Sequence, residues 1–378
     1  MARLPDARDG KLLKIYHQRL DFSLWPMKKS SRRYGLQSRV FISDPWGIIR
    51  YSIETKCLSA SKTPALAFCE QAEDYFKAAS VSGLVAAKPV LLYYSMLNLA
   101  KAFGLTRKTR PIYGNKAYHG LAERIPIGGQ DFIDSILEAI PSSNRNINIF
   151  DDFYKSLNAG NGLSSSFNYE MKYLIPQIVQ AHRLWCSSSN ERERFIPIYK
   201  IDLMQDTVTK SLWLDLFVRD DELYTKGISR KQFLDEAQLD FREVKCTEQE
   251  NGRKLICFEQ NSVINYSHRP SDKVQELVST IKNNLWVTAL SVPPYRKYYT
   301  YLSPSSEVNH RLPQIVSLYA VFYYFGSLTR YRPYNFEKIL SKPYGGFIRE
   351  IIETVPNQFL YLLASEFCKQ EISKPSIV

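Results

Sequence analysis

The stretch Lys88-Pro-Val-Leu-Leu-Tyr-Tyr-Ser-Met-Leu-Asn-Leu-Ala-Lys101 decides the fold class of this chain. Its early proline suits the first turn of a helix, and Gly104 marks the helix end, so a helix is predicted over residues 89–103. Apolar side chains occupy nearly every face of this helix, which leaves almost no polar face for water. We therefore expect it to be surrounded by protein, at the centre of a mainly helical fold.

Further helices are predicted by apolar residues at helical spacing, and they cover residues 63–80, 131–140, 169–185, 272–286, 312–331, 346–354 and 357–368. Pro176 is expected to kink the helix predicted over residues 169–185. Within the central helix, Tyr94 and Leu97 are expected to be core residues.

Strands are predicted in fewer places. Residues 40–42 and 47–53 are rich in β-branched and aromatic side chains, and residues 195–264 approach a period of two. A hairpin turning at Asn251-Gly252 would place Cys246 directly opposite Cys257. Both cysteines are expected to be reduced thiols. Residues 293–301 are interpreted as a loop.

These elements predict an α+β fold, a mainly helical body with an inserted small β-hairpin and sheet region. The expected organisation has four parts: an N-terminal basic segment with short strands over 1–60, the first part of the helical core over 61–190, a β-rich insert over 191–265 and the second part of the core over 266–378.

Composition narrows the class of protein. The 378 residues are 44% hydrophobic, enough for a well-packed core, and the formal charge of +12 favours encounter with polyanions. The first residues lack the apolar core of a signal peptide, and six scattered cysteines do not suit a disulfide scaffold. The uncharged stretch between Arg311 and Arg330 is too polar for a membrane span. We therefore expect a cytoplasmic protein that does not enter membranes.

Several segments resemble, in this order, the YaaC-like family of bacterial proteins. They are the stretch 88–101, Tyr118-His-Gly-Leu121, the helix 319–325 with the following Leu328-Thr-Arg-Tyr-Arg-Pro333, and Pro356-Asn-Gln-Phe-Leu360. The resemblance covers residues 60–370 and is weakest in the β-rich insert. It implies a shared fold and no particular reaction.

Residues 93–101 also resemble the tyrosine-rich helix of HEPN domains, which are common in RNA-targeting defence systems. An active HEPN ribonuclease needs an arginine and a histidine about four to six residues apart, so that both reach one phosphodiester. Every histidine of this chain follows its nearest preceding arginine by nine positions or more. The sequence therefore departs from the catalytic pattern of that class.

A metal-dependent nuclease of the restriction type is the alternative function. Such enzymes place an Asp on one strand and Glu-x-Lys on the next, where the carboxylates hold Mg²⁺. Asp44 with Glu54 and Lys56 fits this pattern loosely, and so does Asp215 or Asp220 with Glu243 and Lys245. Glu-x-Lys arises often by chance in a charged chain, so solvated strand charges are the favoured explanation of both matches.

The histidines leave other interpretations open. His182 and Cys186 stand four apart, but no second pair at ligand spacing accompanies them, so a packed helix face is expected rather than a metal site. His119 beside Gly120 could line a pocket near the central helix, or be a hydrogen-bonded structural histidine. No metal or cofactor is expected.

Cations interleaved with aromatic rings predict contact with nucleic acid, through phosphate pairing and base stacking. The candidates are Arg107, Lys108, Arg110, Tyr295, Arg296, Lys297, Arg330 and Arg332. Tyrosines that pack a loop, and arginines that complement a helix end, are the competing interpretation. We expect a non-catalytic accessory protein that binds nucleic acid weakly or binds a protein partner or a second copy, in a bacterial defence or stress setting.

Overall fold

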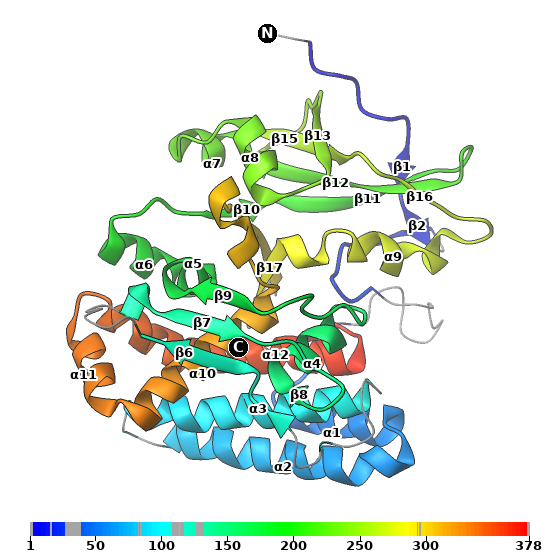
Figure 1. Ribbon diagram of the computed structural model, residues 1–378. Coiled ribbons are helices and arrows are strands. Elements are labelled where there is room, and N and C mark those ends of the chain that lie inside the picture. The colour runs from blue at the N-terminus through cyan, green and yellow to red at the C-terminus, as the bar shows by residue number, and fades with distance from the viewer. Residues whose placement is uncertain are drawn as a thin grey trace. The chain divides into compact units, whose positions relative to one another are not determined.

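The computed structural model describes residues 3–15, 17–26, 39–81, 83, 85–107, 113, 117–125, 132–292, 294 and 296–375. They form an α+β protein of helices and several small separate sheets, as expected (Figure 1). The chain divides into two compact units. The β-rich unit contains Met1–Ile42, Arg192–Asn309 and Lys369–Val378, and the helical unit contains Ser43–Glu191 and His310–Cys368.

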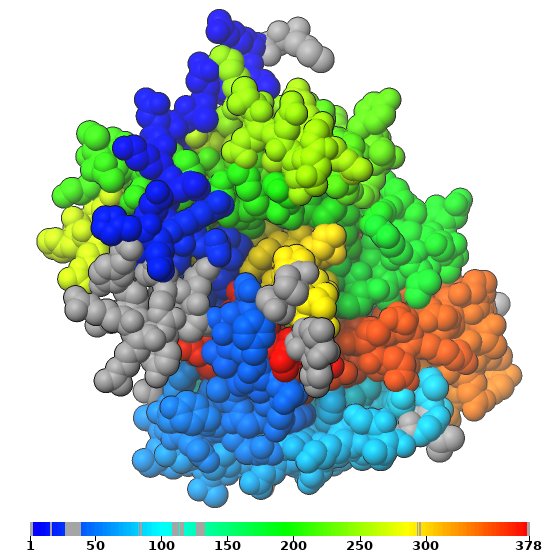
Figure 2. Space-filling view, turned by 180° about the vertical axis from the view of Figure 1, so that it is seen from behind, coloured from blue at the N-terminus to red at the C-terminus, as the bar shows by residue number. Residues whose placement is uncertain are grey.

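Long helices build the helical unit, and their bounds are α1 Pro45–Lys56, α2 Ser59–Val81, α3 Lys88–Thr106, α4 Ile149–Leu157, α10 Gln314–Tyr331, α11 Pro333–Ser341 and α12 Gly345–Cys368. Helix α3 packs against α2, α10 and α4, so the stretch that decides the fold is central, as predicted. Helix α2, drawn in blue, lies on the outside of the helical unit (Figures 1 and 2).

Short elements complete the helical unit. Strand β5 Ala117–Tyr118 pairs with β8 Ile147–Asn148 in parallel. Strand β7 Ile136–Ala139 lies between β6 Leu121–Arg124 and β9 Phe167–Glu170, antiparallel to both. The remaining pieces are the short helices α5 Met171–Leu174 and α6 His182–Ser189 with the 3₁₀ turns Phe132–Asp134 and Ile175–Gln177.

The β-rich unit contains one larger sheet, whose antiparallel strands follow the order β1 Lys11–Leu12, β11 Lys200–Asp206, β12 Ser211–Arg219, β15 Arg253–Gln260 and β13 Phe241–Val244. Strand β14 Gln249–Glu250 also pairs with β15, and β16 Ile264–Asn265 with β12. A second sheet has the order β10 Phe195–Ile198, β18 Arg296–Tyr301 and β17 Leu285–Ala289.

Smaller pieces finish this unit. The two-stranded sheets are β2 Lys14–Ile15 with β3 Gln18–Arg19, and β4 Val40–Phe41 in parallel with β19 Ile372–Ser373. Its helices are α7 Asp220–Thr225, α8 Arg230–Ala237 and α9 Val274–Ser279, with 3₁₀ turns at Pro270–Asp272 and Lys282–Asn284. A further 3₁₀ turn, Ser305–His310, ends on the first residue of the second helical-unit segment.

The strand predicted over residues 47–53 is wrong, because this segment lies inside helix α1. The side chain of Asp44 accepts a hydrogen bond from the Trp46 backbone nitrogen at 3.0 Å, and Pro45 occupies the first helical position. An aspartate cap followed by proline is a strong helix start, and here it outweighs the strand preference of the following β-branched residues.

Other element predictions are also corrected. Residues 131–140 were expected to be helical, but β7 occupies the second half of this segment. The helix predicted over 169–185 is broken into β9, α5, a 3₁₀ turn that includes Pro176, and α6. The loop predicted over 293–301 contains strand β18, and the predicted helix 272–286 ends early, before β17.

The predicted hairpin forms, but with two registers. Next to the turn, Glu250 pairs with Arg253 as expected. Further from the turn, Val244 rather than Cys246 lies opposite Cys257, so the predicted cysteine pair is wrong. The extra residues of the chain between β13 and β14 shift the register, and Cys246 packs beside the cluster that contains Cys257.

Core predictions on the central helix are half right. Leu97 is buried, with 5% of its surface exposed, whereas Tyr94 is only partly buried. None of the helices in the described part of the chain combines the length and the apolar character that crossing a bilayer requires.

The domain boundaries drawn from sequence compare with these units as follows. Segment 61–190 lies inside the helical unit, and segment 191–265 lies inside the β-rich unit except for Glu191, which belongs to the helical unit. Segments 1–60 and 266–378 are each divided between the two units.

Candidate functional site

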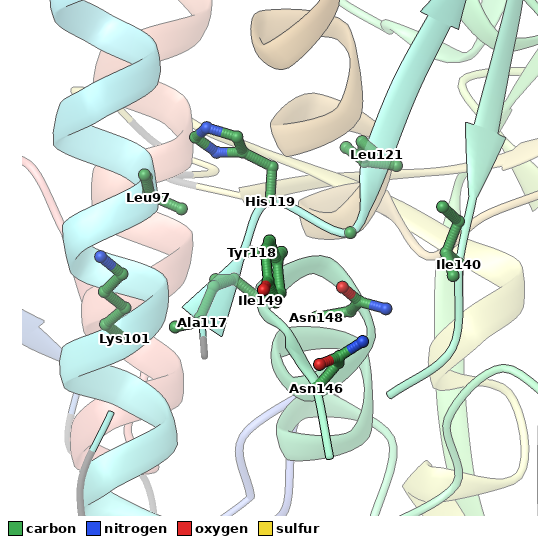
Figure 3. A pocket seen from close by; sticks show the side chains of 11 residues that line it. Leu97, Lys101, Ala117, Tyr118, His119, Leu121, Ile140, Asn146, Asn148 and Ile149 are labelled. Atoms are coloured by element: carbon green, nitrogen blue, oxygen red, sulfur yellow. The ribbon is translucent and has the colours of Figure 1, made fainter. Parts of the chain in front are cut away.

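A pocket of about 500 Å³ lies in the helical unit, bordered by α3, the segment 117–121 and the start of α4 (Figure 3). Apolar parts of its walls come from Leu97, Ala117, Leu121, Ile140 and Ile149. The polar side chains at the pocket are Lys101, Tyr118, His119, Asn146 and Asn148. We call this the His119 pocket.

Backbone hydrogen bonds hold the segment 117–121 in place. The His119 carbonyl accepts from the Phe150 nitrogen at 3.1 Å, and the Gly120 carbonyl accepts from the Ile140 nitrogen at 2.9 Å. Gly120 has a φ of +75°, and a Cβ added to it would meet the Asn148 Cβ at 2.7 Å. Only glycine therefore combines this backbone conformation with this close approach.

His119 is hydrogen-bonded as well as pocket-lining, which joins the two interpretations made from sequence. Its Nδ1 lies 2.5 Å from the hydroxyl of Tyr93 on α3. Burial, with further contributions from Arg330 and Lys101, lowers the pKa of His119, so the ring is neutral at neutral pH. When Tyr93 donates to Nδ1, the ring proton lies on Nε2.

A cluster of tyrosines surrounds this hydrogen bond. The Tyr93 ring contacts those of Tyr319 and Tyr323 edge-on, with centroids 5.9 and 5.2 Å away. The Tyr323 hydroxyl donates to the Leu121 carbonyl at 2.7 Å. Burial raises the pKa of Tyr93 and of Tyr323, so both hydroxyls keep their protons at neutral pH.

Lys101 supplies the cation of the His119 pocket. Figure 3 shows Leu97 and Lys101 on the same side of α3, the side that faces His119 and Ala117. The Lys101 Nζ lies 5.0 Å from the centroid of the Phe68 ring, and among the described residues no carboxylate lies within ion-pair distance of it. Burial lowers the pKa of Lys101.

A second candidate site lies at the end of α10 and along α11, and contains Arg330, Tyr331, Arg332, Tyr334 and Lys338. We call it the Arg–Tyr surface, and it forms part of the orange area in Figure 2. Its tyrosine residues are open to solvent, 61% exposed at Tyr331 and 66% at Tyr334.

Cations accompany these rings. Arg330 lies over the Tyr331 ring at 4.1 Å and donates to the hydroxyls of Tyr94 and Tyr331, and Lys338 lies 4.4 Å from the Tyr334 centroid. Glu337 is the acidic residue of α11. The surface therefore keeps an excess of positive charge.

The other predicted nucleic-acid residues are not gathered at this surface. Arg107 donates to the Glu366 carbonyl and lies 4.8 Å from the Phe103 ring centroid. Arg296 is buried, donates to the Ile372 carbonyl and lies 5.0 Å from the Trp25 ring, so its role is structural. Lys297 is exposed. Lys108, Arg110 and Tyr295 lie outside the described residues.

The first nuclease pattern does not form strands. Asp44 caps α1, Glu54 is exposed on that helix, and Lys56 donates to the Phe367 carbonyl at 2.9 Å. The side chains of Asp44 and Lys56 are thus both engaged in holding α1 in place.

The second nuclease pattern is spread over separate strands. Asp215 on β12 faces Glu259 of β15, whereas Glu243 on β13 faces Phe258 and pairs with Arg230. Lys245 pairs with Asp6 at 2.5 Å. Asp220, which begins α7, also pairs with Arg230, at 3.2 Å.

His182 and Cys186 do lie together. The Cys186 sulfur is 3.3 Å from Nε2 of His182, and Nδ1 of His182 is 2.8 Å from the Pro176 carbonyl. In the described part of the chain, no three His, Cys, Asp or Glu side chains converge as metal ligands.

Sequence reasoning missed Lys101, Tyr331 and Tyr334. Lys101 is a cation at the end of the otherwise uncharged residues 89–100, and this isolated charge could have indicated a functional residue. The tyrosines gave a weaker signal, because Tyr is abundant throughout the chain and only the structure separates exposed rings from buried ones.

Together, the fold and these sites define an α+β protein with a cation-bearing pocket and an exposed Arg–Tyr surface. The chain belongs to the YaaC-like family, since the family model described as YaaC-like Protein matches residues 30–367. No curated protein and no solved structure matches the chain.

Proposed function

We propose that this protein is a non-catalytic binding protein that binds single-stranded nucleic acid through the Arg–Tyr surface. The observation that carries the proposal is the exposure of Tyr331 and Tyr334 beside Arg330, Arg332 and Lys338. Exposed rings can stack on bases, while neighbouring cations pair with phosphates, and neither contact depends on the base sequence.

The physical cost of leaving these rings in water supports a binding role. An exposed aromatic ring gains little for the fold, whereas stacking on a base contributes about 1 to 3 kcal/mol. No carboxylate in the described part of the chain lies within ion-pair distance of Arg330 or Arg332. Both arginines can therefore pair with a phosphate without breaking an ion pair inside the protein.

The non-catalytic part of the proposal is supported by where the nuclease candidates lie. Asp44 and Lys56 hold helix α1, and Asp215 and Glu243 lie on strands that β15 separates. A metal nuclease needs its carboxylates at one point. The likeness of residues 93–101 to the HEPN helix connects the proposal with bacterial defence.

The test is fluorescence anisotropy with a labelled single-stranded oligonucleotide of mixed sequence and the purified full chain. If three cations of the surface contact phosphates, raising the salt concentration fourfold should weaken binding about 20-fold. Tyr334→Ala should weaken binding at least about fivefold, since a stacked base is lost.

Matched control variants are available in the β-rich unit. Tyr224→Ala removes a tyrosine that is 86% exposed, and Arg269→Ala removes an exposed arginine. Both should leave the affinity unchanged, whereas Arg332→Ala should reduce it and flatten the salt dependence. Absence of binding at low salt, or equal loss in Tyr224→Ala and Tyr334→Ala, would show that this surface is not the binding site.

A further inference from the structure

Among the described residues, the His119 pocket combines apolar side chains with one cation. Five apolar side chains line it, and a single amine, that of Lys101, stands in its wall with an aromatic ring and no carboxylate nearby among the described residues. An ammonium group that is partly removed from water loses hydration energy, and an anion bound beside it would restore that energy.

Among the described residues that line the pocket, Lys101 carries the one positive charge. His119 is neutral at neutral pH, because burial lowers its pKa and Arg330 and Lys101 lower it further. The amide of Asn148 donates to the Pro141 carbonyl at 2.9 Å, so it is already engaged. Asn146 also lines the pocket, and no described residue hydrogen-bonds its side-chain amide.

We propose that the His119 pocket binds a small organic monoanion, a carboxylic acid with an apolar or aromatic body. The carboxylate pairs with the Lys101 Nζ, and the body of the ligand lies against Leu97, Leu121 and Ile149. A volume of about 500 Å³ lies within the usual range of small-molecule sites.

Nucleotides and other polyphosphates fit this pocket less well. Sites for such ligands supply several cations, often with a fork of arginine donors. Here the charge of Arg330 lowers the pKa of His119, but the guanidinium group of Arg330 donates to the hydroxyls of Tyr94 and Tyr331. One lysine matches one carboxylate in charge.

This inference is independent of the proposed nucleic-acid binding, since the residues that carry it are different. Loss of the Arg–Tyr surface by Tyr334→Ala should leave the pocket's ligand affinity unchanged. Loss of the pocket cation should likewise leave oligonucleotide binding unchanged.

The test is isothermal titration calorimetry of the full chain with 4-phenylbutyrate and with its neutral amide, 4-phenylbutyramide. These probes share an apolar body and differ in the charge. We expect the carboxylate to bind at least about tenfold more tightly than the amide, because a charge-assisted hydrogen bond contributes about 1.5 to 3 kcal/mol. Phenyl phosphate should not bind more tightly than the carboxylate.

Substitutions of Lys101 test whether this residue causes the preference for the carboxylate over the amide. Lys101→Met keeps the length of the side chain without its charge, and should bind both probes equally. Lys231→Met, which removes an exposed lysine in the β-rich unit, should keep the full preference. Lys101→Gln serves as a second variant if Lys101→Met does not fold.

A second test, protection of Lys101 from chemical modification, uses the unaltered protein. Bound 4-phenylbutyrate should shield Lys101 from reductive methylation, read by mass spectrometry, and leave Lys231 reactive. Equal affinity for the two probes, no binding at millimolar concentration, or a preference that survives in the folded Lys101 variants would each overturn the proposal.

Discussion

The carboxyl group of Asp215 on β12 lies opposite that of Glu259 on β15 in the antiparallel register, and both residues are buried. On the other side, Asp202 of β11 also lies opposite Asp215. Arg242 pairs with Glu259 at 2.7 Å, and Arg19 pairs with Asp202 at 2.5 Å. Burial, then the charges of Glu259 and Asp202, raises the pKa of Asp215 to about 7.

Asp215→Asn should therefore change how stability depends on pH. The folded pKa lies above the unfolded value, so the native state holds a proton that the unfolded state releases, and this contribution is lost as the pH rises from about 4 to about 7. The asparagine side chain of the variant does not titrate, so the variant does not lose this stability as the pH rises. Urea denaturation should show the variant gaining about 2 kcal/mol relative to the parent between pH 5 and pH 8.

Asp235→Asn, at an exposed aspartate of the same unit, is the matched control for that measurement. A stability difference between Asp215→Asn and the parent that is identical at both pH values would contradict the assignment of the raised pKa.

Leu97→Ala should destabilise the protein by about 2 to 5 kcal/mol, because Leu97 is buried on the central helix α3 and truncation leaves a cavity. Urea denaturation measures the difference. Leu58→Ala, at a leucine that is 49% exposed, should stay within about 0.5 kcal/mol of the parent. Equal effects of the two changes would argue against the central position of α3.

Gly120→Ala should be more destabilising than Gly160→Ala. Both glycines have positive φ, so alanine strains the backbone at either position. Only at Gly120 would the added Cβ also collide, at 2.7 Å from the Asn148 Cβ, whereas nothing lies within 4 Å at Gly160. The difference in melting temperature between the two variants measures the close approach that shapes the His119 pocket, and equal values would contradict it.

Arg296→Met should cost about 3 kcal/mol, because Arg296 is buried and donates to the Ile372 carbonyl. Lys297→Met, at the next position, removes an exposed cation and should be almost neutral. Thermal unfolding compares the two. If the Arg296→Met variant were as stable as the parent but bound the oligonucleotide more weakly, Arg296 would be a nucleic-acid-binding residue rather than a structural one.

Periodicity predicted the elements that are buried on several sides. Helices α3 and α10 were recognised because their apolar residues leave little polar surface, and the turn at Asn251-Gly252 because both residues accept positive φ. Helix α11 was not predicted, since its nine residues follow α10 after a single residue and are mostly exposed.

Short segments were harder, because tertiary pairing decides them. Residues 296–301 form β18 between two partner strands, although their tyrosines and cations read equally well as a surface loop. The same pairing explains why Arg296 was assigned to a binding surface from sequence. For the pocket, sequence supplied His119 and Gly120, but not the distance from them to Lys101, which depends on how the segment 117–121 packs on α3.

Strand β19, whose Ile372 pairs with Val40 of β4, has a consequence for the speed of folding. These partners stand near opposite ends of the sequence, and the residues between them include the whole helical unit. Closing so long a loop costs chain entropy before the pairing returns any stability. The helical unit, whose central contacts α2 with α3 are local, should therefore acquire hydrogen-exchange protection early in refolding, and the β4–β19 amides should be protected last.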